Sequence, residues 1–139
     1  MTTRTRITIG SLAVFAIFAA GLAYRHYTAP APQEAANESI GVTLAIEGVL
    51  PLHATTVKKG TTALEFLRNE SHETGFALEE KEYAGLGSMV ERIESFENGT
   101  NGKYWTYTVN GAFAAVGADA YELRPQDAIE WTFAVPENY

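Results

Sequence analysis

Few side chains in this 139-residue sequence have the types and spacing that catalysis or metal binding requires. Glu79, Glu80 and Glu82 could act as a paired acid and base, but such dense charge on a strand is more typical of a solvated sheet edge. His53 and His72 lie 19 residues apart with no carboxylate or second imidazole at ligand spacing, and the chain has no cysteine. We therefore expect no metal site, no intrinsic cofactor and no enzyme activity.

Aromatic and small apolar side chains offer a different chemistry, which is the binding of an apolar ligand. Residues 113–117 read Phe-Ala-Ala-Val-Gly and predict an apolar loop, although a loop after a tight turn is normally polar. Small side chains let a flat ligand approach the backbone, and Phe113 and Val116 offer dispersion contacts. The same loop could instead tuck over the edge of the core. Tyr104 could lay its ring against this ligand or be an ordinary exposed tyrosine.

Both tryptophans are predicted to belong to the core. Trp105 shares a strand face with Tyr107 and Val109, and aromatic residues at alternate strand positions usually pack inside. We expect Trp131 to pack against the predicted helix from the apolar face of the last strand, which consists of Ile129, Trp131, Phe133 and Val135.

The elements that position these residues follow from hydrophobic periodicity. Apolar side chains alternate with small or polar ones over residues 40–46, which predicts a half-buried strand, and a second strand is expected at 54–57. Thr62 and Glu65 have the spacing of a capping box. The helix that they begin should stop at Gly75.

Further strands are predicted by alternation and by the Asn-Gly turns near them, which accept positive φ. One helix among about six strands, placed after the first hairpin, predicts an α+β domain in which a mixed sheet grasps the helix. The additional strand ranges are 76–83, 89–96, 103–109 and 129–135.

An 18-residue stretch without charged side chains, residues 7–24, follows Arg4 and Arg6. At about 1.5 Å per residue it just spans a hydrocarbon core of roughly 30 Å. The pattern is that of a signal anchor or a signal peptide, and either one exports the rest of the chain. We favour a retained membrane-spanning helix because Arg25 and His26 directly follow the small residues where cleavage would fall.

The chain is therefore expected to have four parts. Residues 1–6 form a basic cytoplasmic N-terminus, 7–24 a transmembrane signal anchor, 25–38 an extended proline-containing linker, and 39–139 one extracytoplasmic domain. Cleavage of the anchor would make the domain a secreted one. Beyond residue 25 there are seven basic and 17 acidic residues, a formal charge of −10, so a nucleic-acid partner is not expected.

Residues 104–111 read Tyr-Trp-Thr-Tyr-Thr-Val-Asn-Gly, and residues 117–131 contain Gly-Ala-Asp-Ala-Tyr-Glu-Leu-Arg-Pro. Both segments resemble the transcobalamin-like C-terminal domain family, DUF4430, which includes the C-terminal β-domain of transcobalamin and intrinsic factor. Residues 61–67 and 85–96 resemble earlier stretches of that family, so the likeness covers nearly the whole exported domain. The resemblance implies a β-grasp-like fold related to soluble-ligand-binding modules.

In that family the loop that matches residues 113–117 faces a corrinoid, so the resemblance implies cobalamin or a related corrinoid as the ligand. The helical domain that also holds the corrinoid in the animal carriers has no counterpart in this sequence, so weaker binding is expected. Gln126 stands where the family usually has Gly, which predicts a positive φ with some strain. The candidate ligand-binding residues are Tyr104, Asn110, Phe113, Ala114, Ala115, Val116, Gly117 and Tyr121.

A second hypothesis is a structural or adhesive module that docks onto a surface protein or polymer. The same apolar loop would then be an interface hot spot. A concave pocket beside the loop would favour a small-molecule ligand, whereas a flat patch would favour a surface partner.

Overall fold

The computed structural model describes residues 38–136. The predicted cytoplasmic N-terminus, the predicted membrane span and nearly all of the predicted linker lie outside these described residues. Over residues 38–136, no helix has the length and apolar character to cross a membrane.

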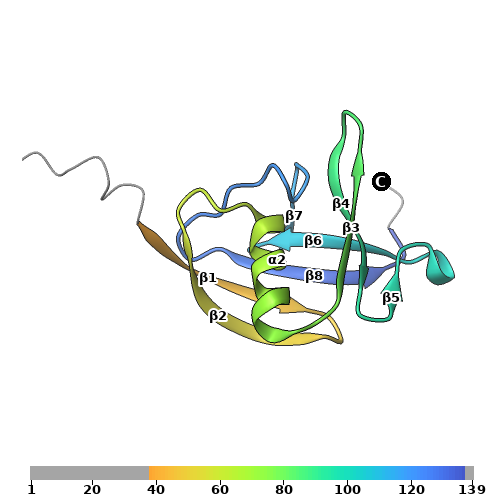
Figure 1. The fold of residues 1–139 in the computed structure, drawn as a ribbon, viewed down its shortest axis with the longest axis horizontal. Helices are drawn as coiled ribbons and strands as arrows, with labels where there is room; N and C mark the ends of the chain where they lie inside the picture. Colours follow the sequence, from red (N-terminus) through yellow and green to blue (C-terminus); the bar gives the residue numbers. More distant parts are fainter. Residues whose placement is uncertain (1–37, 137–139) are drawn as a thin grey trace, which may run out of the picture. The chain divides into compact units, whose positions relative to one another are not determined.

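A five-stranded mixed sheet forms the body of the domain (Figure 1). Its strand order is β2-β1-β8-β6-β7, and only the central pair β1 and β8 is parallel, while the other neighbours are antiparallel. The first and last strands of the domain thus lie side by side at its centre. The strands are β1 (Ser39–Ile46), β2 (Leu50–Lys58), β6 (Tyr104–Val109), β7 (Ala112–Phe113) and β8 (Ala128–Ala134).

The helix α2 (Ala63–Thr74) crosses one face of this sheet (Figure 1). The predicted capping box is confirmed, since the Thr62 hydroxyl accepts a hydrogen bond from the Glu65 N–H and the Thr62 N–H donates to the Glu65 carboxylate. Gly75 ends the helix at φ 87°, a left-handed conformation that glycine adopts without a Cβ clash. The buried side chains of the helix are Ala63, Leu64, Phe66, Leu67 and Glu70.

A smaller antiparallel sheet has the order β3-β4-β5, with strands β3 (Leu78–Tyr83), β4 (Gly87–Ile93) and β5 (Phe96–Glu97). A 3-10 helix, η2 (Thr100–Gly102), connects it to β6. The predicted strand at 89–96 is wrong in its extent, because Glu94 takes a positive φ of 53° and divides β4 from β5. These elements make the domain α+β, as predicted.

The core lies between α2 and the covered face of the large sheet. The pairing of β8 with β1 on one side and β6 on the other places Ile129 between Leu44 and Val109. It likewise places Trp131 between Ile46 and Tyr107. Both tryptophans are buried as predicted, with Trp105 at 6% and Trp131 at 3% exposure.

Two further sequence predictions about strand extent are wrong. The expected final strand ends at Ala134, so Val135 does not continue the apolar face and is 58% exposed. The second strand begins at Leu50, well before residue 54, because β1 and β2 continue to pair up to Ile46 and Leu50.

Candidate ligand-binding site

The predicted apolar loop is exposed at one end of the large sheet. Phe113 is the last residue of β7, and the chain then leaves the sheet through residues 114–117. Phe113 is 59% and Val116 48% exposed, so the loop does not bury these side chains over the core. An exposed apolar loop of small residues is the feature that a ligand or a partner can use.

Buried Asp127 holds together two predicted site residues. Its carboxylate accepts hydrogen bonds from the Asn110 side-chain amide and the Tyr121 hydroxyl, each at 2.9 Å, and from the Arg124 N–H. The Asn110 side-chain oxygen in turn accepts from the Ala128 N–H. Asn110 and Tyr121 therefore use their side-chain polar atoms for hydrogen bonds within the domain. These two residues support the structure beneath the site.

Sequence reasoning missed Asp127 as a site-building residue. The available signal was local: a carboxylate three residues after Arg124 is placed to accept the Arg124 N–H and close a turn. Burial raises the pKa of the Tyr121 hydroxyl, and the hydrogen bond to Asp127 adds to this effect. Tyr121 thus remains a donor toward this carboxylate at neutral pH.

Tyr107 fixes the far end of the loop. Its hydroxyl donates to the Val116 carbonyl at 2.7 Å, and burial raises its pKa to about 12, with Tyr121 and Asp119 contributing. The phenol stays protonated at physiological pH and so remains able to donate this hydrogen bond to the loop.

Asp119 connects the loop to the β3–β4 hairpin. Its carboxylate accepts from the Ser88 N–H at 2.9 Å. A Cβ at Gly117 would lie 2.7 Å from Asp119 Oδ1, and a Cβ at Gly87 would overlap Asp119 Oδ2. Glycine at these two positions permits the close approach of loop and hairpin.

Tyr104 is separated from the other candidates. It begins β6, pairs with Ala134 and is 45% exposed, whereas the loop follows the opposite end of the same strand (Figure 1). The six residues of β6 put about 16 Å between the two ends. The structure thus brings Asn110, residues 113–117 and Tyr121 together and leaves Tyr104 outside this group.

A pocket of about 640 Å³, the loop pocket, lies beside the apolar loop. Of its two cations, Lys59 pairs with Glu38, whereas Arg124 takes part in no ion pair among the described residues. The lining residues are Lys59, Gly60, Ala115, Val116, Ala120, Tyr121, Glu122, Leu123, Arg124 and Pro125.

A second pocket of about 350 Å³, the aromatic pocket, lies on the other side of the same loop. Residues 115 and 116 line the loop pocket, whereas residues 117 and 118 line the aromatic pocket. Its lining residues are Leu86, Ser88, Met89, Val90, Trp105, Tyr107, Gly117, Ala118 and Trp131.

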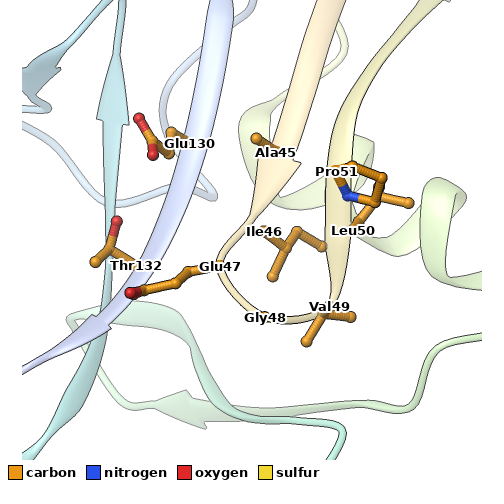
Figure 2. A pocket seen from close by; sticks show the side chains of 9 residues that line it. All are labelled: Ala45, Ile46, Glu47, Gly48, Val49, Leu50, Pro51, Glu130 and Thr132. Atoms are coloured by element: carbon orange, nitrogen blue, oxygen red, sulfur yellow. The ribbon is translucent and has the colours of Figure 1, made fainter.

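A third pocket of about 600 Å³, the hairpin pocket, surrounds the β1–β2 turn (Figure 2). Figure 2 shows Glu47 reaching from this turn toward Thr132 on β8, with Glu130 nearby on the same strand. Glu47 accepts a hydrogen bond from the Phe133 N–H at 3.1 Å and so ties the turn to β8. The Glu47 carboxylate thus has a structural role, and the lining of this pocket includes no cationic side chain that would offset its negative charge.

Two of the ion pairs among the described residues involve carboxylates of β3. Glu80 receives two hydrogen bonds from the Arg68 guanidinium, and Glu79 pairs with Arg92. β3, which carries both carboxylates, is the edge of the small sheet, as the charge density predicted. Across residues 38–136, no group of three or more potential metal ligands is found.

Fold and site define a small α+β domain with an exposed apolar loop between two pockets. Residues 60–134, more than half of the chain, match the family described as "Domain of unknown function (DUF4430)", and the chain belongs to this family. The resemblance recognised in residues 104–111 is confirmed. Among curated proteins, no sequence matches the chain.

Solved structures share the fold at low sequence identity. Haptocorrin in complex with Cbi is similar with a TM-score of 0.57 and 20% identity, over 70% of this chain and 26% of the haptocorrin chain. This chain thus spans about a quarter of haptocorrin's length. A proposed metal-binding protein from Ruminococcus gnavus ATCC 29149 is similar with a TM-score of 0.52 and 16% identity, over 73% of this chain and 100% of the other.

Proposed function

We propose that this domain is a ligand-binding module that captures a flat, partly apolar small molecule in the loop pocket. The observation that carries the proposal is an exposed apolar loop, tethered at Val116 by the Tyr107 hydroxyl, beside a pocket of about 640 Å³. This volume falls in the range typical of small-molecule sites. Arg124 supplies a donor for acceptor or anionic groups on the rim of the ligand.

A corrinoid is the ligand class to test first. Haptocorrin, which was solved in complex with Cbi, shares this fold, and the fold likeness supports a corrinoid as the first candidate. Corrinoids are broad and flat, and their amide side chains present hydrogen-bond acceptors to a group such as Arg124. The low identity carries the fold only, so the ligand must be established on this chain.

The setting of the module is also part of the proposal. A signal anchor over residues 7–24 would hold the domain at the outer face of the membrane on a linker, where it could present ligand to another component. Cleavage of that segment would release the same module. We assign it no catalytic role.

Titration of the full chain in lipid nanodiscs with cobinamide and cobalamin tests the ligand class. Calorimetry should detect heat, and the visible spectrum of the corrinoid should shift on binding. No heat and no spectral shift at millimolar ligand would remove the corrinoid from consideration.

Matched variants locate the site. Val116→Glu places a carboxylate in the loop pocket and should weaken binding at least about tenfold, because it adds charge where apolar contact is needed. Val135→Glu makes the same change at a similarly exposed valine outside the pocket and should leave affinity unchanged. Equal effects of the two variants would place the site elsewhere.

The exposure of Phe113 and Val116 favours one alternative, a structural or adhesive module that docks onto a surface protein. Phe113→Ala should then weaken capture of the partner from surface extracts while the domain stays folded. Capture that is unchanged in Phe113→Ala and Val116→Ala would count against this alternative.

A further inference from the structure

The aromatic pocket differs in chemistry from the loop pocket. Its floor consists of the buried Trp105 and Trp131 with the half-buried Tyr107, whose ring stacks on Trp131 at 5.2 Å and 27°. Leu86 and Met89 contribute to its wall and are 80% and 49% exposed. Large apolar side chains left in water beside an aromatic floor mark a surface that gains free energy when it is covered.

The polar groups of this floor are satisfied with one exception. Trp105 Nε1 donates to the Phe96 carbonyl at 2.8 Å, and the Tyr107 hydroxyl donates to the Val116 carbonyl at 2.7 Å. Trp131 Nε1 is buried and has no hydrogen-bond acceptor among the described residues. An unsatisfied buried donor costs free energy, which an acceptor on a bound molecule would recover.

We propose that the aromatic pocket is a second binding site, which takes a compact, uncharged ring that carries one hydrogen-bond acceptor. The ring lies among Trp105, Tyr107 and Trp131, and its carbonyl or ether oxygen accepts from Trp131 Nε1. A volume of about 350 Å³ suits one or two rings and not a corrinoid. An ionised ligand is disfavoured because the lining offers apolar surface and no charged side chain.

Trp131 Nε1 is buried, so a ligand reaches it only when neighbouring side chains shift. Met89 is 49% exposed on β4 and can shift in this way, while Leu86 remains part of the wall. The hairpin is connected to the loop by the hydrogen bond from the Ser88 N–H to the Asp119 carboxylate, which involves neither apolar side chain.

The chain contains two tryptophans, so an indole-¹⁵N-labelled full chain in lipid nanodiscs gives two indole N–H signals. Acetophenone, a ring with one carbonyl, should move the Trp131 N–H signal downfield in a saturable manner. The Trp105 N–H already donates to Phe96 and should move little. Ethylbenzene, which matches acetophenone in shape and lacks the acceptor, should produce no downfield shift.

A matched pair of variants confines the effect to this pocket. Leu86→Ser removes apolar wall and should weaken acetophenone binding about tenfold. Leu52→Ser makes the same change at a leucine that is 73% exposed on β2, and it should bind like the parent.

Three results would overturn the proposal. They are a Trp131 signal that does not respond up to the solubility limit of acetophenone, a downfield shift of equal size with ethylbenzene, and equal affinities of the Leu86→Ser and Leu52→Ser variants.

Discussion

Glu70 shows how one buried side chain can set the response of the domain to pH. It lies on α2 with 3% exposure, and its Oε2 is 3.5 Å from His53 Nε2 on β2 and accepts no hydrogen bond from the described residues. Burial raises the pKa of the Glu70 carboxyl, the attraction of His53 opposes this rise, and Glu73 adds to it. Ionisation of Glu70 therefore opposes folding.

Glu70→Gln should make the domain more stable at pH 8 by about 1 kcal/mol, because the amide keeps the shape and removes the buried charge. The stability that the protonated Glu70 contributes is complete below its ordinary pKa of 4.5 and is lost as the pH rises through its raised value. The advantage of the variant should thus vanish near pH 4. Urea denaturation from pH 4 to pH 8 measures this trend.

Glu73→Gln is the control for this prediction, since Glu73 lies on the same helix and is exposed. Its effect on the free energy of unfolding should be small at every pH. A Glu70→Gln profile parallel to that of the parent would contradict the role assigned to the buried carboxylate.

Two aromatic residues illustrate the contrast between core and surface. Trp131→Ala should cost about 3–5 kcal/mol, a large share of the 5–15 kcal/mol typical of small domains, because it removes a large, 3% exposed ring from the hydrophobic core. Tyr104→Ala should cost far less, since the ring is 45% exposed at a strand end. Chemical denaturation compares the two, and a Trp131→Ala domain as stable as its parent would refute the packing described for β8.

At the scale of elements, the turn before β8 contains strain that the sequence predicted. Gln126 takes a φ of 70°, which fits its place where the family usually has Gly. Its N–H donates to the Gly41 carbonyl at 2.7 Å and so aligns β8 beside β1. The backbone must therefore hold this conformation despite the Cβ.

Gln126→Gly should raise the free energy of unfolding by about 1 kcal/mol, because relief of the left-handed strain exceeds the added entropy of the unfolded chain. Gln126→Val should lower it by a similar amount or more, since a β-branched residue tolerates positive φ poorly. Thermal unfolding of the parent and the two variants gives their order of stability. If Gln126→Val were more stable than Gln126→Gly, the turn would have relaxed to another conformation.

The sequence predicted the elements that repeat a pattern over several residues. Alternation in residues 40–46 and the capping box at Thr62 were enough to place β1 and α2. β5 and β7 have two residues each, too few for any periodicity, and the parallel pairing of β1 with β8 joins segments far apart in the chain. Long-range register depends on the whole packed domain and not on local composition.

The candidate site was predictable to a similar degree. The loop at residues 113–117 was visible as an apolar interruption of a polar region, and its exposure agrees with a binding role. The bonds of Asp127 to Asn110 and Tyr121 and the unpaired Trp131 N–H could not be foreseen, because each depends on which atoms meet after folding. Tyr104 was grouped with the loop through sequence proximity, although β6 carries it to the other end of the sheet.

At the scale of the whole molecule, charge distinguishes the loop pocket from its surroundings. The chain beyond residue 25 has a formal charge of −10, yet two of its seven cations, Lys59 and Arg124, line this pocket with a single carboxylate, Glu122. Lys59 pairs with Glu38, so Arg124 is the cation left for a ligand. The acidic remainder repels polyanions and keeps the domain apart from phosphate surfaces. A neutral ligand with acceptor groups or a single anionic group is therefore favoured over nucleic acid.

The membrane topology is a prediction from the sequence, since residues 1–37 lie outside the described structure. Arg4 and Arg6 should remain cytoplasmic and the domain should lie outside, because basic residues bias a short N-terminus inward. In intact cells that express a chain tagged at both ends, protease added outside should digest the C-terminal tag and spare the N-terminal one. Permeabilised cells should lose both tags, which shows that each is cleavable. A C-terminal tag protected in intact cells would refute export, and with it the placement of the binding pockets at the cell surface.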